Sequence, residues 1–149
     1  MNIAIDFATE NDLPALADLL HELFTLESDF KPERAKQIAG LKLILDTPAI
    51  GQLFVLRVDG EVAGMANALI TVSTAQGTRV LLLEDVIVGA RNRGGGLGRR
   101  LVEHVCTWAK DQGMARVTLL ADKDNSPALA FYEQLGFEES AMLVRRKGL

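Results

Sequence analysis

The most informative segment of the chain is Val86-Ile87-Val88-Gly89-Ala90-Arg91-Asn92-Arg93-Gly94-Gly95-Gly96-Leu97-Gly98-Arg99-Arg100. It joins an apolar strand to a loop with four glycines in five positions, and the loop opens a helix. Fixing a glycine is less favourable than fixing an alanine by about 0.5–1 kcal/mol, so four glycines are unfavourable as plain filler. Bare amides at a helix N-terminus bind anions, and the neighbouring arginines add positive charge. The segment therefore predicts a phosphate site rather than a flexible turn with solvated arginines.

Two common phosphate-binding loops do not match this segment. A Walker loop needs a lysine and then a serine or threonine after its last glycine, but Gly98 is followed by two arginines. The dinucleotide-binding spacing G-x-G-x-x-G also fails, because its last glycine would fall on Arg99 or Leu101. Nucleotide hydrolysis and NAD binding are both disfavoured.

Composition limits the class of protein. The 149 residues, 48% of them apolar and 24% charged, are typical of one globular domain, which we expect to span residues 1–149. A net charge of −4 argues against a nucleic-acid partner. Cys106 is the one cysteine, so neither a disulfide nor a cysteine-based metal site is expected. We find no signal peptide and no apolar run long enough to span a membrane, and we expect a cytoplasmic protein with no membrane partner.

Periodicity predicts an alternating order of elements. Apolar residues at period two predict strands at 3–7, 52–58, 61–72, 79–88 and 116–121, with a final strand at 137–147. Helical spacing predicts helices at 13–24, 32–45, 98–112 and 126–135. Asp59-Gly60 predicts a tight hairpin. The pattern indicates an α/β fold with a mixed, mostly antiparallel sheet and helices on both of its faces.

Two motifs resemble a known family. Residues 93–98, Arg-Gly-Gly-Gly-Leu-Gly, resemble the R-x-x-G-x-G/A acyl-CoA loop of the GNAT superfamily of N-acetyltransferases. Residues 125–137, from Asn125 to Phe137, are similar to the family's second motif, N-x-x-A-x-x-x-Y-x-x-x-G-F. The motifs stand in the family's order, and the predicted elements match its fold over nearly the whole chain. The resemblance implies a single GNAT-like acyl-CoA N-acyltransferase domain.

The resemblance also implies a co-substrate and residue roles. Acetyl-CoA would donate an acetyl group to a primary amine by direct attack in a ternary complex, without a metal. Tyr132 would protonate the leaving thiolate; the alternative is a tyrosine that only packs on the core. Loop amides would hold the pyrophosphate, and the preceding strand and the second motif would contact the pantetheine arm. These coenzyme-binding residues are Val86, Ile87, Val88, Arg93, Gly94, Gly95, Gly96, Leu97, Gly98, Arg99, Asn125 and Ala128.

Glu84 and Asp85 interrupt an apolar strand, where carboxylates are unfavourable unless they are paired or functional. Strict alternation places them on opposite faces, so at most one should face a given cleft. A primary amine with a pKa of about 10.4 must lose a proton before it attacks. Glu84 is the candidate base, because it shares its parity with Val86 and Val88. The alternative is an ion pair between Glu84 and an arginine such as Arg79.

The acceptor is predicted from a shorter match. Leu83-Glu84-Asp85-x-x-Val88 is similar to a segment of the diamine (spermidine/spermine-type) branch of the superfamily, which also places an acidic contact after the first helix. There this chain has Glu27 and Asp29. Glu27, Glu84 and Asp85 would then bind a small di- or polyamine, although a solvated loop is the alternative for Glu27 and Asp29.

Other partners and functions stay open at this point. A second copy of the chain, forming a homodimer, is a further candidate partner. Two other functions fit the same sequence: an N-acetyltransferase acting on proteins or peptides, and a non-catalytic regulator that binds acyl-CoA on this fold.

Overall fold

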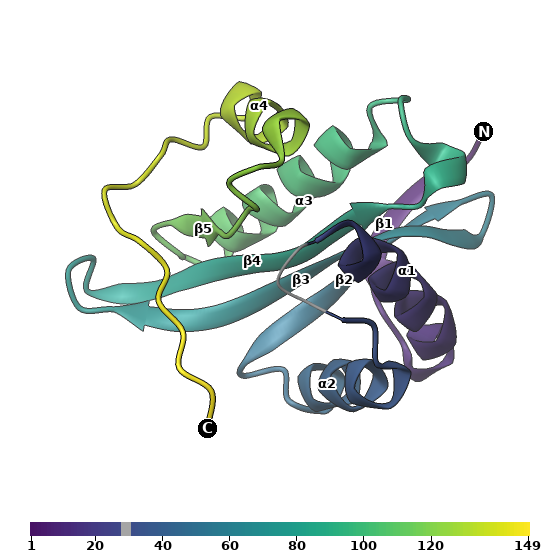
Figure 1. The fold of residues 1–149 in the computed structure, drawn as a ribbon, viewed down its shortest axis with the longest axis horizontal. Coiled ribbons are helices and arrows are strands. Elements are labelled where there is room, and N and C mark those ends of the chain that lie inside the picture. Colours follow the sequence, from purple (N-terminus) through teal and green to yellow (C-terminus); the bar gives the residue numbers. More distant parts are fainter. Residues whose placement is uncertain (28–30) are drawn as a thin grey trace.

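The computed structural model describes residues 1–27 and 31–149. Over these residues the chain forms a five-stranded sheet with two α-helices on each face (Figure 1). In chain order the elements are β1 (Ile3–Phe7), α1 (Leu13–Leu26), α2 (Arg34–Asp46), β2 (Gly51–Val58), β3 (Glu61–Ser73), β4 (Thr78–Val88), α3 (Leu97–Asp111), β5 (Val117–Leu119) and α4 (Ser126–Gln134). Single 3₁₀ turns at Glu10–Asp12 and Ala90–Asn92 precede α1 and α3. The predicted order is confirmed up to α4.

The sheet is mixed. Strands lie in the order β1-β2-β3-β4-β5, and the first four are antiparallel neighbours. β5 runs parallel to β4 but pairs only with Leu81–Leu83. Asp59 and Gly60 both have positive φ, 51° and 86°, as the predicted two-residue hairpin between β2 and β3 requires. Beyond Leu83, β4 therefore has no strand on its β5 side among the described residues.

Alternation along the strands divides the core into two clusters. In β2, Val55 packs with the cluster beneath α1 and α2, and the next residue, Leu56, packs with the cluster beneath α3. Leu16 and Leu20 of α1 are buried in the first cluster. α4 adds half-buried aromatic side chains to the second cluster. Figure 1 shows α3 and α4 above the sheet and α1 and α2 below it.

A nearly buried ion pair anchors the start of α1 to β2. The Asp12 carboxylate accepts hydrogen bonds from Arg57 Nη1 and Nη2 at 2.9 and 2.8 Å, and from the Thr9 backbone amide at 2.8 Å. The hydrogen bonds from Arg57 lower the pKa of Asp12, against the opposing effect of burial. This fork of two parallel bonds fixes the direction in which α1 crosses the sheet.

The predicted strand at 137–147 is wrong. The structure has no strand after α4, and from Glu138 onward every side chain is exposed, with Met142 at 86%. The segment runs as an extended chain from α4 to the side of the sheet where α2 lies (Figure 1, yellow). Its apolar residues, Ala141–Val144, are consecutive and are followed by three cations, so no single face could be buried. The short β5 also offers few groups for pairing.

Candidate active site

The key feature of β4 is a bulge at its acidic pair. Asn67 of β3 lies opposite Glu84, and Met65 lies opposite Ile87, so two residues of β4 oppose the single residue Ala66. Asp85 has φ +54°, which is uncommon for a residue other than glycine but tolerated by aspartate. The extra residue breaks the alternation of side chains along the strand.

The bulge overturns two expectations about the acidic pair. Glu84 and Asp85 were expected on opposite faces, but both line one cleft on the α1/α2 side of the sheet. Val86 and Val88 pack against the α3 side, whereas Ile87 belongs to the α1/α2 cluster. Glu84 therefore does not share a face with Val86 and Val88, because the bulge reverses the parity between them.

The cleft has a volume of about 580 Å³ and lies between α1 and α2 and the strands β3 and β4. Burial raises the pKa of Asp85, although a hydrogen bond from Asn67 Nδ2 (3.1 Å) opposes the shift. Burial and the neighbouring Asp85 raise the pKa of Glu84, and the charge of Arg146 opposes this. Arg79 is not the partner of Glu84, because its Nη2 donates to the Gln112 carbonyl oxygen (2.7 Å) at the end of α3.

The glycine loop follows the C-terminal end of β4. Gly94 and Gly96 have φ of +87° and +76°, a region that alanine avoids. A Cβ added at any position from 94 to 96 would meet no described atom within 4 Å, so the loop's main chain is unobstructed. Gly96 is the N-cap of α3 and has no side chain to cap it. The amides of residues 97–99 precede the first intrahelical bond, from Arg100 N to Gly96 O (3.2 Å), and can bind an anion.

Two arginines of this region, Arg93 and Arg99, are paired with glutamates. Arg93 Nη2 donates to Glu22 Oε1 (2.6 Å), and its Nε donates to the Val88 carbonyl oxygen (2.8 Å). The same Glu22 oxygen accepts the Ala90 amide (2.9 Å), so α1 holds the loop in place. Arg99 Nε donates to Glu103 Oε1 (2.8 Å) one helical turn away. These pairs offset the charge of Arg93 and Arg99, so an anion at the loop would interact with its amides, the α3 dipole and the remaining arginines of the segment.

The second motif forms α4 beside the loop. Asn125 is the N-cap of α4, and its Oδ1 accepts the amide of Ala128 (3.2 Å) in the first turn. A Cβ on Gly98 would lie 3.4 Å from the Phe131 ring, so α4 packs closely over the start of α3. Leu97 is buried in the α3-side cluster. The residues predicted for the coenzyme thus lie on three connected elements: the end of β4, the glycine loop and α4.

Tyr132 is half-buried on α4 against the rings of Phe131 and Phe137, with centroids 5.1 and 5.8 Å away. Burial raises the pKa of Tyr132 to about 12, and the charge of Glu27 adds to the shift. The hydroxyl is therefore protonated at neutral pH. Glu27, just after α1, is close enough for its charge to act on Tyr132, whereas Asp29 lies outside the described residues.

Sequence reasoning missed three polar residues of this region: Glu22, Gln37 and Asn67. Asn67 interrupts an otherwise apolar run at 62–70, which was a usable signal. Gln37 shares a helical stripe with Leu41 and Ile44, but glutamine usually lies at the protein surface, so no role was predicted for it. Only the fold brings Glu22 to Arg93, because they are 71 residues apart.

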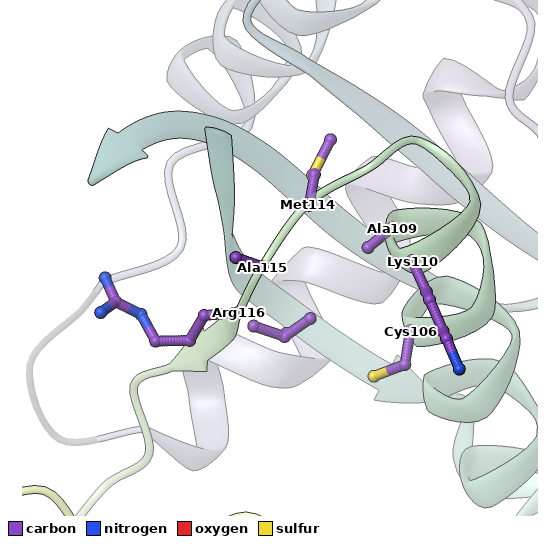
Figure 2. Close-up of a pocket in the computed structure, with 7 residues that line it drawn as sticks. Cys106, Ala109, Lys110, Met114, Ala115 and Arg116 are labelled. Atoms are coloured by element: carbon purple, nitrogen blue, oxygen red, sulfur yellow. The ribbon is translucent and has the colours of Figure 1, made fainter. Parts of the chain in front are cut away.

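Other regions offer less. A smaller pocket of about 410 Å³ lies between the end of α3 and the start of β5; Figure 2 shows Cys106 and Lys110 on the helix and Arg116 at the strand. Burial raises the pKa of the Cys106 thiol, which disfavours a nucleophilic role.

The described residues contain no group of three or more His, Cys, Asp or Glu that could hold a metal. No helix in this part of the chain is long and apolar enough to cross a bilayer.

Comparison with known proteins agrees with this geometry. The model of the acetyltransferase (GNAT) family matches residues 13–137, and the chain belongs to this family. It is 34% identical over 79 residues to streptothricin acetyltransferase of Streptomyces lavendulae, covering 53% of this chain and 40% of that protein. It is 32% identical over 97 residues to glucosamine 6-phosphate N-acetyltransferase of Trypanosoma brucei brucei, covering 64% of each. In both cases the match spans less than two thirds of the relative.

The fold is shared with solved structures over the full chain. A transcriptional regulator from Bacillus halodurans C-125 superposes with a TM-score of 0.84 at 30% identity, covering 99% of this chain and 100% of that one. The observed mixed sheet of five strands, with helices on both faces, is thus that of a GNAT domain.

Proposed function

We propose that the protein is an acetyl-CoA-dependent N-acetyltransferase that acts on a primary amine by direct transfer in a ternary complex. One observation carries the proposal: β4 turns two carboxylates into a cleft at its bulge, ends three residues after Asp85, and is followed by the glycine loop at the start of α3. A single strand would thus carry the base for an amine and lead into the site for a diphosphate.

The coenzyme would be held by main-chain groups. Residues 94–99 would bind the pyrophosphate through the unobstructed loop and the uncapped amides of α3. The backbone of Val86–Val88 would pair with the pantetheine arm along the edge of β4 that β5 leaves free, with Asn125 and Ala128 alongside. When bound, acetyl-CoA supplies the acetyl group as a thioester, which an unprotonated amine can attack.

Two side chains would move protons. An amine with a pKa of about 10.4 loses its proton at pH 7 at a cost of roughly 4.6 kcal/mol. Glu84 would accept that proton directly or through water, and its raised pKa brings it closer to that of the amine. Tyr132, protonated at neutral pH, would hold its proton at Oη for the leaving sulfur.

The acceptor would be a small amine. Asp85 and Glu84 would attract its ammonium group, and the resemblance to the diamine branch, with Glu27 nearby, makes a di- or polyamine one candidate. Two relatives are named for other acceptors, streptothricin and glucosamine 6-phosphate. A non-catalytic acyl-CoA-binding regulator is the second candidate, favoured by the name of the full-length structural relative.

The test is release of CoA thiol from acetyl-CoA in the presence of a panel of amines, with CoA binding measured by calorimetry. Tyr132→Phe keeps the ring packing, and we expect it to lower kcat by about 100-fold or more while CoA still binds. An unchanged kcat would remove Tyr132 from the mechanism. Binding of CoA without thiol release from any amine would favour the regulator instead.

A further inference from the structure

The cleft contains two buried amide side chains, each with an unused polar atom. Gln37 of α2 is 8% exposed and Asn67 of β3 is 4% exposed, and both line the cleft. Gln37 Nε2 and Asn67 Oδ1 have no hydrogen-bond partner among the described residues. Both atoms are themselves shielded from solvent. Leaving a buried polar atom unpaired costs about 1–3 kcal/mol, so each amide would gain by turning to pair with a ligand in the cleft.

One of these atoms belongs to an end of the cleft that accepts hydrogen bonds. Asn67 Nδ2 donates to Asp85 Oδ2 (3.1 Å), which fixes the amide with Oδ1 as its free atom. Glu84 also lines the cleft, and its carboxylate can only accept when ionised. The Asn67 end therefore suits a group that has only donors and a positive charge, which is a primary ammonium.

The other free atom has the opposite character. Gln37 Nε2 is a donor, so it needs an oxygen or another acceptor on the ligand. The rim nearby carries Lys31 and Lys36 against one acid, Glu33, and Lys36 Nζ lies 2.8 Å from Glu33 Oε2. The rim therefore has an excess of one positive charge. A second ammonium group on the ligand would lie beside the Gln37 donor and the lysines of the rim, so its binding at this end is unfavourable.

The wall of the cleft is apolar. Its side chains come from α1, α2, β3 and the residue before β2, and include Leu20, Phe24, Leu41, Ile44 and Leu69. Contact with this wall favours the binding of methylene groups or a ring, because it buries apolar surface. It does not favour the binding of a chain of charged groups.

We infer, building on the proposed function, that the acceptor is a monoamine with an apolar body and a hydrogen-bond-accepting oxygen, and not a polyamine. Its ammonium group lies at Asn67, Asp85 and Glu84. Its hydroxyl, carbonyl or carboxylate oxygen accepts from Gln37 Nε2. A carboxylate gains further from the lysines of the rim.

A matched series of substrates tests this inference, with thiol release as the readout. For each chain length from butyl to octyl, the series compares the alkylamine, the amino alcohol, the ω-amino acid and the diamine, with spermidine added. We expect the amino alcohol or amino acid of the best length to exceed the alkylamine by about 10-fold in kcat/KM, and the diamine to be poorest. Scanning the length avoids any assumption about the spacing of the two ends.

Gln37→Leu supplies the matched variant, and Gln76→Leu in the exposed β3–β4 turn is its control. Gln37→Leu should bring the ratio of amino alcohol to alkylamine close to one, whereas Gln76→Leu should keep the parent ratio. Since Gln37→Leu removes a buried unpaired amide, we also expect its melting temperature to stay level or rise.

The possible outcomes distinguish a failure of this inference from a failure of the proposed function. Thiol release that is fastest with diamines or spermidine would overturn the inference and leave the acetyltransferase in place. So would a Gln37→Leu variant that slows every amine equally. Thiol release from no amine would overturn the proposed function, and the inference with it.

Discussion

Gly96→Ala tests whether the left-handed backbone of the glycine loop is what binds the coenzyme. Gly96 is the N-cap of α3 with φ +76° and ψ 10°, and a Cβ there would meet no described atom within 4 Å. The added methyl group therefore introduces no clash. Its cost is the conformational strain of an alanine in the left-handed region, about 1–2 kcal/mol.

This strain should appear in coenzyme affinity rather than in stability. Beyond Arg93, which Glu22 holds, the loop is exposed from Gly94 to Gly96, and a Cβ at these positions would meet no described atom, so local relaxation is possible there. Binding must then restore the strained conformation, and 1–2 kcal/mol corresponds to a Kd for CoA that is about 5- to 30-fold weaker. Isothermal titration with CoA measures this, and urea unfolding measures the stability of the same variant.

Gly77→Ala is the matched control. Gly77 has φ +70° and equally open surroundings, but it lies in the β3–β4 turn, where its amide donates to the Ser73 carbonyl oxygen (2.8 Å). The two strands hold this turn, so we expect a loss of about 1–2 kcal/mol in unfolding free energy and an unchanged Kd for CoA. The reasoning is refuted if Gly96→Ala binds CoA as tightly as the parent protein, or if both variants weaken CoA equally.

Two further predictions concern carboxylates. Glu84 must be ionised to act as a base, so kcat/KM should fall as the pH drops through its raised pKa. The Glu84→Gln variant should lack this acidic limb of the pH profile, and its kcat should be lower by about 100-fold. An identical limb in the variant would assign the titration to another group. Asp12 has a lowered pKa, so its pairing with Arg57 stabilises the fold above the ordinary carboxyl pKa, and this stability is lost as the pH falls through the lowered value. Asp12→Asn should therefore destabilise the protein by about 2 kcal/mol at neutral pH, and urea unfolding in acid should show the difference closing.

The spacing of apolar residues predicts most helices and strands of the fold, but it fails where one inserted residue changes the geometry of a strand. The strands and helices up to α4 follow from apolar periodicity, with ends that differ by a few residues: α2 begins at Arg34 and β5 is reduced to Val117–Leu119. The bulge at Asp85 could not be derived from alternation, since alternation assumes that no residue is inserted. An acidic pair inside an apolar strand signalled a special site, but not that both side chains face one cleft.

The site is harder to derive than the fold because its parts meet through tertiary contacts. The glycine loop and Tyr132 were visible as local motifs. Glu22 and Gln37 were not, since a glutamate on α1 or a glutamine on α2 is an ordinary surface residue until the fold brings the first to the glycine loop and the second to the cleft. Their roles depend on partners far away in the sequence, such as Arg93 for Glu22.

Helix α1 contacts both the glycine loop and the cleft and so fixes their relative positions. Along its turns, Leu20 and Phe24 form part of the cleft wall, Glu22 ties down the glycine loop, and Glu27 beyond its end acts on Tyr132. Its position depends on buried leucines and on the pair between Asp12 and Arg57. A change at that pair should therefore disturb coenzyme binding and acceptor binding together, because both depend on the placement of one helix. A change on α2, which contributes Gln37 to the cleft but no residue to the loop, should alter only the choice of acceptor. In the proposed function, the part of the site held by α1 would bind the coenzyme, and α2 would vary the part that binds the acceptor.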